Sequence, residues 1–179
     1  AAAPRAMSAL PRPAVLALTS LVMVAFAARV LGRPVKWTAA RSEDFLAATQ
    51  GRGATTEGTL HVAPDGRFLG LEARLDFPLG HWTPYSAFAA GRNAGRILPG
   101  PYVVEAVDIA LESRFTQRPA VNIYRGAGRP EAAILMERLV EKAARETGID
   151  PLALRRRNVR PADALPATSP TGEWLDAGD

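Results

Sequence analysis

The chain has 179 residues, of which 47% are hydrophobic and 22% charged, a balance typical of one globular domain rather than of a disordered segment. It contains no cysteine, which excludes disulfides, thiolate-held zinc and any iron–sulfur cluster ligated by the chain itself. The net charge is +4, and Lys36 and Lys142 are the only lysines, so nearly all the positive charge is arginine. Arginine suits bidentate contacts with phosphate and carboxylate groups.

The first apolar segment covers residues 14–28 and raises a targeting question. Arg5 and Arg12 precede it and small residues close it, as in a secretory signal peptide. The segment is shorter than the roughly 20 apolar residues of a transmembrane helix, and it runs on to a normal helix stop at Gly32 and Pro34. We expect a buried helix here, and a signal peptide is the alternative.

The next segments predict strands. Residues 35–37 are typical of a short strand, and residues 42–45 of a capped turn. Apolar and polar residues alternate over 59–62 and again over 69–77, with Asp-Gly at residues 65–66 as a turn between them. This pattern predicts a β-hairpin with Leu69, Leu71, Ala73, Leu75 and Phe77 on its buried face.

Residues 78–101 are rich in glycine, proline and aromatic residues and show no period, so we expect a long connection that lines a pocket. Trp82, Tyr85 and Phe88 within it could face a substrate or form the small core of the loop itself. Alternation returns at residues 107–111 and predicts another strand.

Pro130 is expected to open a long amphipathic helix in the favoured first position, and Gly148 to end it. Glu141 and Arg145 would pair on its outer face. Asp-Pro at residues 150–151 then caps a second helix that ends at Asn158, and a loop-like tail follows. The apolar stripe of the long helix is expected to consist of Ala132, Leu135, Met136, Leu139, Val140 and Ala143.

The segment before the long helix carries the strongest chemical signal. Residues 124–131 read Tyr-Arg-Gly-Ala-Gly-Arg-Pro-Glu, so that Gly126, Gly128, Arg125 and Arg129 lie where a strand-like run turns into a helix. Glycines allow close approach of the backbone, and the free N–H groups of the first helical turn would point at a docked anion. The turn lacks the remaining residues of a dinucleotide fingerprint or a P-loop, so an ordinary strand-to-helix turn is the other interpretation.

The other candidate sites have weaker support in the sequence. Arg155, Arg156 and Arg157, with Arg160 nearby, could contact an anionic polymer, but no aromatic residues interleave with them, and a solvated helix face or subunit contact is the alternative. The only two histidines are well separated, which offers neither zinc-ligand spacing nor a Ser-His-Asp arrangement. Glu131 could act as an acid or base, although acidic residues are common in first helical turns for dipole reasons alone.

Read together, several segments resemble the molybdenum-binding large subunit of the xanthine dehydrogenase, aldehyde oxidase and carbon monoxide dehydrogenase family. Their order and spacing are specific to this family. The segments are residues 31–37, 45–52, 98–102, 124–131, 148–151, 154–158, 170–172 and 176–179.

The resemblance implies a molybdopterin cofactor, usually the cytosine dinucleotide form in bacterial members, and oxidation of an aldehyde or heterocycle-type substrate with water as the oxygen source. Electrons would leave through the iron–sulfur and FAD subunits of a heterotrimer-type complex. By this resemblance Arg125, Gly126, Ala127, Gly128 and Arg129 bind the cofactor. Copper-containing members have a cysteine at the position of Gly126, and xanthine-type members an aromatic at that of Ala127, so neither copper chemistry nor a purine substrate is expected.

Two family motifs have no counterpart: a Gly-Gly-Phe-Gly-Gly loop, and the general-base glutamate near the far C-terminus of the full subunit. We therefore expect an internal fragment, with residues 1–20 unmatched, residues 21–179 belonging to the molybdopterin-binding domain, and no catalytic or metal-ligating residue of its own. It should be inactive alone.

The expected fold is α+β, with antiparallel hairpins packed against a few helices as part of a larger domain. The expected compartment is the cytoplasm, with the periplasm as the alternative. A basic, non-catalytic binding module that contacts an anionic partner through residues 155–160 is the alternative function.

Overall fold

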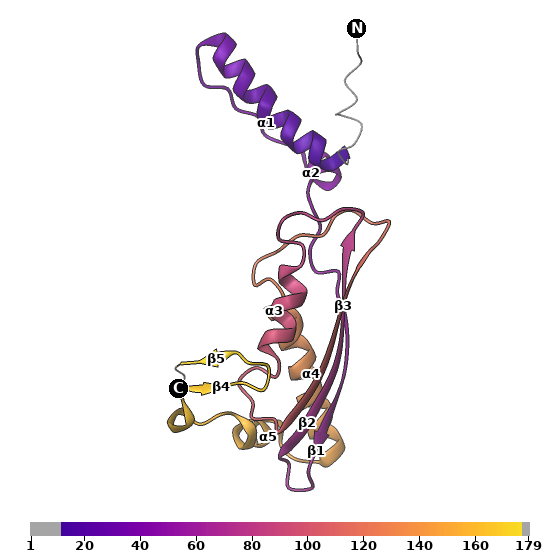
Figure 1. Ribbon diagram of the computed structural model, residues 1–179, viewed down its shortest axis with the longest axis vertical. Helices are drawn as coiled ribbons and strands as arrows, with labels where there is room; N and C mark the ends of the chain where they lie inside the picture. The colour runs from indigo at the N-terminus through magenta and orange to yellow at the C-terminus, as the bar shows by residue number, and fades with distance from the viewer. Residues whose placement is uncertain (1–11, 177–179) are drawn as a thin grey trace. The chain divides into compact units, whose positions relative to one another are not determined.

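The computed structural model describes residues 12–176, with the side chains from residue 21 onward except that of Ala47. The chain divides into two compact units, Ala1–Gln50 and Gly51–Asp179, which are described separately (Figure 1). The predictions made for residues 1–11, and most of the C-terminal Asp-Ala-Gly-Asp motif, lie outside the described residues. The expected boundary at residue 20 stays a prediction.

The first unit consists of the helices α1 (Arg12–Leu31) and α2 (Arg41–Ala47). The predicted first helix is confirmed, but the prediction that it is buried is wrong for its described side chains, since Leu21, Phe26 and Val30 are exposed. The physical reason is that the described part of this unit offers α1 only one short helix as a packing partner. Residues 12–176 contain no helix long and apolar enough to cross a membrane.

Two smaller predictions for this unit have different outcomes. The expected capped turn is the start of α2, where the backbone N–H of Ala40 donates to the Glu43 carboxylate at 2.6 Å. Residues 35–37 form no strand, so that prediction is wrong. A lone three-residue strand has no partner within the described part of this unit, and strands need neighbours for their hydrogen bonds.

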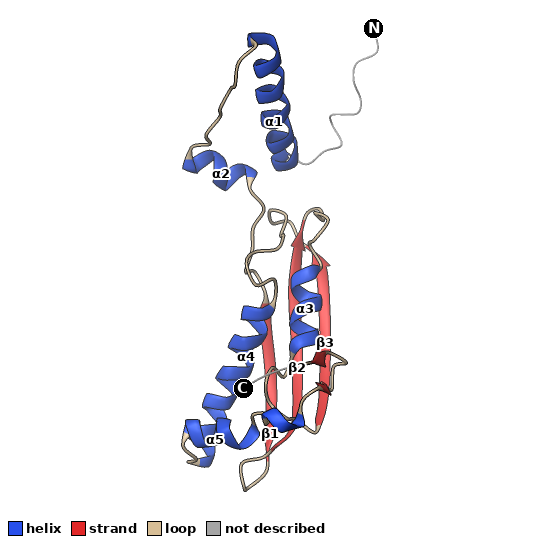
Figure 2. Ribbon diagram, turned by 90° about the vertical axis from the view of Figure 1, so that its left-hand side faces the viewer, coloured by secondary structure: helices blue, strands red, loops and turns tan. Residues whose placement is uncertain are grey.

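The second unit is built on a mixed three-stranded sheet in the order β1 (Thr55–Val62), β2 (Phe68–Gly80) and β3 (Ala106–Phe115). The antiparallel β1–β2 hairpin is confirmed. The strand β3 runs parallel to β2, and such a pair needs a crossover connection. That crossover contains α3 (Ala89–Ile97), which lies on the same sheet face as α4 (Arg129–Thr147) (Figures 1 and 2). Residues 78–101, expected to form one long connection, therefore include the end of β2 and the helix α3, which corrects that prediction.

The remaining elements are α5 (Pro151–Asn158), a 3₁₀ turn (Ala162–Ala164) and a small antiparallel pair, β4 (Ala167–Thr168) with β5 (Trp174–Leu175). The last pair corrects the prediction of a purely loop-like tail. The predicted cap of α5 is confirmed, because Asp150 accepts a hydrogen bond from the backbone N–H of Ala153 at 2.8 Å. Helices packed on a sheet confirm the predicted α+β fold. The expected antiparallel hairpins are confirmed for β1–β2, but β3 is parallel to β2, which corrects that part of the prediction.

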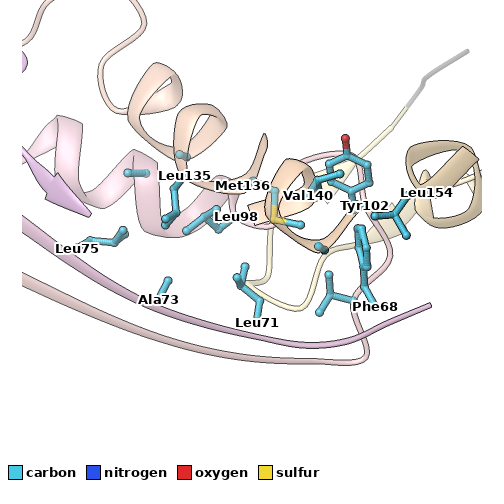
Figure 3. Close-up of a cluster of buried hydrophobic side chains, with 14 of the residues drawn as sticks. Phe68, Leu71, Ala73, Leu75, Leu98, Tyr102, Leu135, Met136, Val140 and Leu154 are labelled. Carbon is cyan, nitrogen blue, oxygen red and sulfur yellow. The ribbon is translucent and has the colours of Figure 1, made fainter. Parts of the chain in front are cut away.

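The hydrophobic core lies between the sheet and α4 (Figure 3). The predicted helix stripe is confirmed, with Leu139 partly buried and its other members buried. The predicted strand face is confirmed except at its first position, where Phe68 is 2% exposed and Leu69 is 37% exposed. A register irregularity between His61 and Val62 places Phe68 opposite Val62, and a one-residue slip moves a side chain to the other sheet face.

Candidate functional site

The glycine turn predicted from the sequence lies directly before α4 and has an unusual backbone. Gly126, Ala127 and Gly128 have φ values of 93°, 41° and 92°, all in the left-handed region. Two hydrogen bonds between residues three apart in the sequence close the turn. They run from Ala127 N–H to the Tyr124 carbonyl at 2.8 Å and from Arg129 N–H to the Gly126 carbonyl at 3.0 Å. Residues 122–124 directly before it belong to no strand, which corrects the predicted strand-to-helix junction.

Every carbonyl of this turn accepts a hydrogen bond from protein. Besides the two closing bonds, Arg52 donates to the Arg125 carbonyl, Asn93 donates to the Ala127 carbonyl at 3.0 Å, and Ala132 N–H donates to the Gly128 carbonyl at 3.1 Å. In a trans peptide the C=O and the following N–H point in opposite directions. The N–H groups that follow the Tyr124, Arg125 and Ala127 carbonyls therefore point away from these partners.

These N–H groups belong to Arg125, Gly126 and Gly128, and none has an acceptor among the described residues. Consecutive backbone N–H groups in a turn with left-handed residues form a concave site that attracts anions. The turn thus combines carbonyls bound to protein with N–H groups that have no protein acceptor. Arg125 and Gly126 are exposed, whereas Gly128 is buried.

The first turn of α4 offers fewer free N–H groups than the sequence predicts. Arg129 N–H is used by the Gly126 carbonyl, and Pro130 has no N–H, so of the first helical turn only Glu131 N–H is free. The expected row of free N–H groups in that turn is therefore wrong. Donors to an anion come mainly from the turn itself.

The turn is held closely against α3 at Gly128. A Cβ atom at this position would lie 1.9 Å from the Ala90 carbonyl oxygen and 2.9 Å from the Ala94 backbone nitrogen. Only glycine fits such an approach, and its φ of 92° also favours glycine. Asn93, from the same helix, fixes the neighbouring carbonyl. Helix α3, which the sequence did not predict, therefore supports the predicted turn.

Arg52, which lies 73 residues before Arg125 in the sequence, also supports the turn. Its Nη1 atom lies 3.2 Å from each carboxylate oxygen of Glu131, its Nη2 atom donates to the Arg125 carbonyl, and its guanidinium carbon lies 5.0 Å from the centre of the Tyr124 ring. From the sequence, Arg52 lies only within a segment that resembles the family, and no role for it can be predicted. Glu131, a candidate acid or base, is instead the ion-pair partner of Arg52.

The cavity beside the turn is small. It is about 10 Å³ in volume, which is room for about one water molecule. It is lined by residues that include Arg52, Phe77, Asn122 and Ala127. Arg125 and Arg129 do not line this cavity and are exposed. The solvent-facing part of the turn that carries them is called its open side.

The donors on that open side fit an anionic group. Main-chain N–H groups and the exposed guanidinium groups of Arg125 and Arg129 are all hydrogen-bond donors. Among residues 12–176, no cluster of histidine, aspartate and glutamate side chains could hold a metal ion. The donors of the turn therefore suit an anionic group.

A family comparison identifies this domain. The family model described as "Molybdopterin cofactor-binding domain" matches residues 16–159, well over half of the chain. The chain belongs to this molybdopterin cofactor-binding family. The predicted family membership is confirmed.

Individual relatives agree with the family model. The chain is 33% identical over 147 residues to subunit gamma of the 6-hydroxypseudooxynicotine dehydrogenase complex of Paenarthrobacter nicotinovorans, a match that covers 82% of this chain and 18% of the relative. It is 30% identical over 155 residues to the carbon monoxide dehydrogenase large chain of Hydrogenophaga pseudoflava, covering 84% and 19% respectively. The homologues also include molybdenum-binding subunits of xanthine dehydrogenase and an aldehyde oxidoreductase.

Solved structures share the fold. Quinoline 2-oxidoreductase from Pseudomonas putida 86 matches with a TM-score of 0.77 and 32% identity over 88% of this chain and 20% of that chain. Carbon monoxide dehydrogenase from Oligotropha carboxidovorans matches with a TM-score of 0.72 and 26% identity, with the same coverage. This molybdopterin-binding chain thus spans about a fifth of the length of the relatives it matches.

The other candidate residues of the molybdopterin-binding chain have separate surroundings. His61 contacts Glu72 at 2.9 Å and His81 contacts the Arg118 carbonyl at 3.0 Å, so each has its own partner. Tyr85 is fully exposed and Phe88 about half exposed. The structure thus does not bring these residues together in one site.

The positive charge of the basic segment, residues 155–160, is partly neutralised by acidic side chains. Arg155 donates to Glu137 and Glu141, each at 2.8 Å, and its hydrogen bond to Glu137 is the main cause that raises its pKa. The predicted pair of Glu141 with Arg145 is therefore wrong, because Arg155 takes Glu141 as its partner. Arg156 and Arg157 are exposed, but the segment as a whole is not a free cationic patch.

Proposed function

We propose that this chain forms part of the molybdopterin-binding cleft of a molybdenum hydroxylase large subunit, with residues 125–129 next to the cofactor. The observation that carries the proposal is the orientation of the turn: its carbonyls bind protein and its N–H groups at Arg125, Gly126 and Gly128 are free. Such an arrangement in a family that binds molybdopterin supports an anion-binding role for the turn.

In this proposal the residues have distinct roles. The N–H groups of Gly126 and Gly128 donate to the negative edge of the cofactor, and Arg125 and Arg129 supply charged donors on the same open side. Ala127 lends its backbone to the turn. The cofactor, when bound, supplies oxidation of a carbon centre with oxygen taken from water.

The finer parts of the proposal follow the relatives. Quinoline 2-oxidoreductase and nicotine 6-hydroxylase are named for nitrogen heterocycles, which supports a heterocycle or aldehyde as substrate. Subunit gamma of the 6-hydroxypseudooxynicotine dehydrogenase complex is by name part of a complex. We propose iron–sulfur and FAD subunits as partners, the cytosine dinucleotide form of molybdopterin and a cytoplasmic location.

We further propose that the chain is inactive by itself. The described residues hold no metal-ligand cluster, and the one carboxylate beside the turn, Glu131, is bound to Arg52. The base that activates water must then come from elsewhere in the assembly.

The test is to purify the complete assembly from the native host through a tag on this chain and to measure molybdenum and released pterin per copy. We expect both, together with released cytosine nucleotide after acid hydrolysis. A complete assembly that contains this chain but neither molybdenum nor pterin would overturn the proposal.

A further inference from the structure

We propose that Arg52 is a positioning residue that keeps the turn in the conformation that leaves the N–H of the exposed Gly126 free, and that Glu131 is its counter-ion. This inference rests on the proposed function, because the exposed N–H groups matter only if the turn binds an anionic group. Three observations carry it: the peptide plane that Arg52 holds, the number of contacts that fix Arg52, and the distribution of charge around the turn.

The first observation concerns the peptide plane between Arg125 and Gly126. Arg52 donates to the carbonyl at one end of this plane, and the free N–H of Gly126 is at the other end. Glycine tolerates many backbone conformations, so a plane next to Gly126 could rotate at little cost without a partner. A rotation would present a carbonyl to the anion in place of a donor. The contact from Arg52 therefore determines which group faces outward.

Asn93 plays the same part for the next free donor. It donates to the Ala127 carbonyl at 3.0 Å, and the N–H at the other end of that peptide belongs to Gly128. Two side chains from distant parts of the sequence thus each hold the carbonyl of one peptide plane of the turn. A purely structural loop has no need to leave the N–H groups of these planes without a protein acceptor.

The second observation is that Arg52 is itself tightly constrained. Its guanidinium is held by the Glu131 carboxylate, the Arg125 carbonyl and the face of the Tyr124 ring. Its φ of 61° lies in the left-handed region, which is uncommon for a residue other than glycine. A backbone conformation of this kind persists only where the surroundings determine it. Arg52 is thus placed to hold one geometry.

The third observation is electrostatic. The side chain of Glu131 is only 12% exposed and that of Arg52 is 36% exposed, and the two form an ion pair at 3.2 Å. The charge of Arg52 is therefore balanced by its neighbour. The uncompensated cations of the turn are Arg125 and Arg129, for which the structure shows no side-chain ion pair within residues 12–176. Arg52 acts through the backbone, and Arg125 and Arg129 act directly.

The first test needs no ligand. The full chain is labelled with ¹⁵N-glycine, and the amide signals of Gly126 and Gly128 are compared in wild type, Arg52→Gln, Arg52→Lys and Arg74→Gln. Arg74 is exposed on β2 and is outside the turn, so its variant controls for the loss of one positive charge. The signals of Gly58 and Gly70 in the sheet report whether each variant keeps its fold.

We expect the Gly126 signal to shift and to gain fast motion in Arg52→Gln, to change less in Arg52→Lys, and to stay as in wild type in Arg74→Gln. Lysine can keep one contact but not the fork and the ring contact together. If Arg52→Gln does not fold, the Arg52→Lys variant decides. An unchanged Gly126 signal in the folded Arg52 variants would overturn the proposal.

A second test uses inorganic molybdate as the anion. We expect molybdate to shift the Gly126 and Gly128 signals of wild type, and Arg52→Gln to bind about fivefold more weakly, the effect of one lost hydrogen bond. Glu131→Gln should not weaken molybdate binding, because it leaves an uncompensated cation near the turn. If molybdate does not shift the Gly126 and Gly128 signals of wild type, that result would count against the proposed anion site. The motion of Gly126 without ligand would still decide the role of Arg52.

Discussion

The side-chain oxygen of Asn158 accepts a hydrogen bond from the backbone N–H of Phe68 at 2.8 Å, and both residues are buried. The amide nitrogen of Asn158 also donates to the carbonyls of Gly66 and Leu154, each at 2.9 Å. One side chain thus joins the end of α5 to the β1–β2 turn and the start of β2. The second unit depends on this residue for the correct attachment of its last helix.

We therefore predict that Asn158→Ala lowers the free energy of unfolding by about 3 kcal/mol, because it leaves buried backbone groups without partners. Chemical denaturation of both proteins, followed by circular dichroism, measures the difference. Arg156→Ala, an exposed change on the same helix, is the control and should cost less than about 0.5 kcal/mol. Equal stability of the Asn158→Ala and Arg156→Ala variants would contradict the prediction.

The two glycines that flank α4 provide a matched pair of substitutions. Gly128 and Gly148 have φ values of 92° and 73°, so alanine is strained at either. At Gly148 the new Cβ meets open space, but at Gly128 it would lie 1.9 Å from the Ala90 carbonyl oxygen. We predict a loss of about 1 kcal/mol for Gly148→Ala and about 3 kcal/mol for Gly128→Ala. Thermal melts of both variants check this, and a smaller loss at Gly128 would contradict the close contact with α3.

Because the phenol of Tyr102 is buried, the free energy of unfolding is expected to depend on pH in the alkaline range. Burial, and then its hydrogen bond to Glu137 at 2.7 Å, raise the pKa of Tyr102 from 10.0 to about 12. Below pH 10 the folded and unfolded chains both keep the proton, so its contribution to stability is complete. Between pH 10 and 12 the unfolded chain ionises first, and stability falls.

Urea denaturation of wild type, Tyr102→Phe and Tyr85→Phe across this pH range measures the effect. We expect wild type to lose stability above pH 10, Tyr102→Phe to show a shallower loss, and Tyr85→Phe, a change of a fully exposed side chain, to behave like wild type. Identical slopes for wild type and Tyr102→Phe would show that Tyr102 is not the group responsible.

The alternative of a basic binding module can be tested separately. Because Arg155 is occupied by Glu137 and Glu141, we predict that the chain binds single-stranded DNA only weakly, with a shallow dependence on salt of about one or two released counterions. Fluorescence anisotropy over a series of salt concentrations measures the slope. A slope of about four or more that is lost in an Arg156→Gln, Arg157→Gln double variant would favour the binding module instead.

Local signals explain what the sequence could predict of the fold. The alternation in β2, the Asp-Gly turn at residues 65–66 and the glycine cap of α4 act over a few residues, and all three are confirmed. Helix α3 was missed because its buried positions are Gly91 and Ala94, which carry no large apolar side chain. The parallel pairing of β2 with β3 could not be predicted, because alternation is the same for either strand direction.

In the candidate site, too, local features could be predicted from the sequence and contacts between distant residues could not. The glycines of the turn could be identified from the sequence because their chemistry is local. Arg52 could not be connected to the turn, since it lies 73 residues before Arg125 and meets it only in the folded chain. The directions of the Gly126 and Gly128 N–H groups also depend on hydrogen bonds from Arg52 and Asn93, which no sequence pattern contains.

The central claim is that the open side of the turn binds molybdopterin, and Arg125 tests it most directly. Its side chain is exposed, and the one contact that the structure shows for this residue within the described chain uses its carbonyl, so Arg125→Gln should leave the fold intact. Arg145→Gln, an exposed change with the same loss of charge at the other end of α4, is the matched control.

The measurement is the molybdenum and pterin content per copy of the complete assembly purified from its native host with each variant. We predict full content for wild type and Arg145→Gln and a severalfold lower content for Arg125→Gln. Equal content in all three assemblies, or none in wild type, would contradict it.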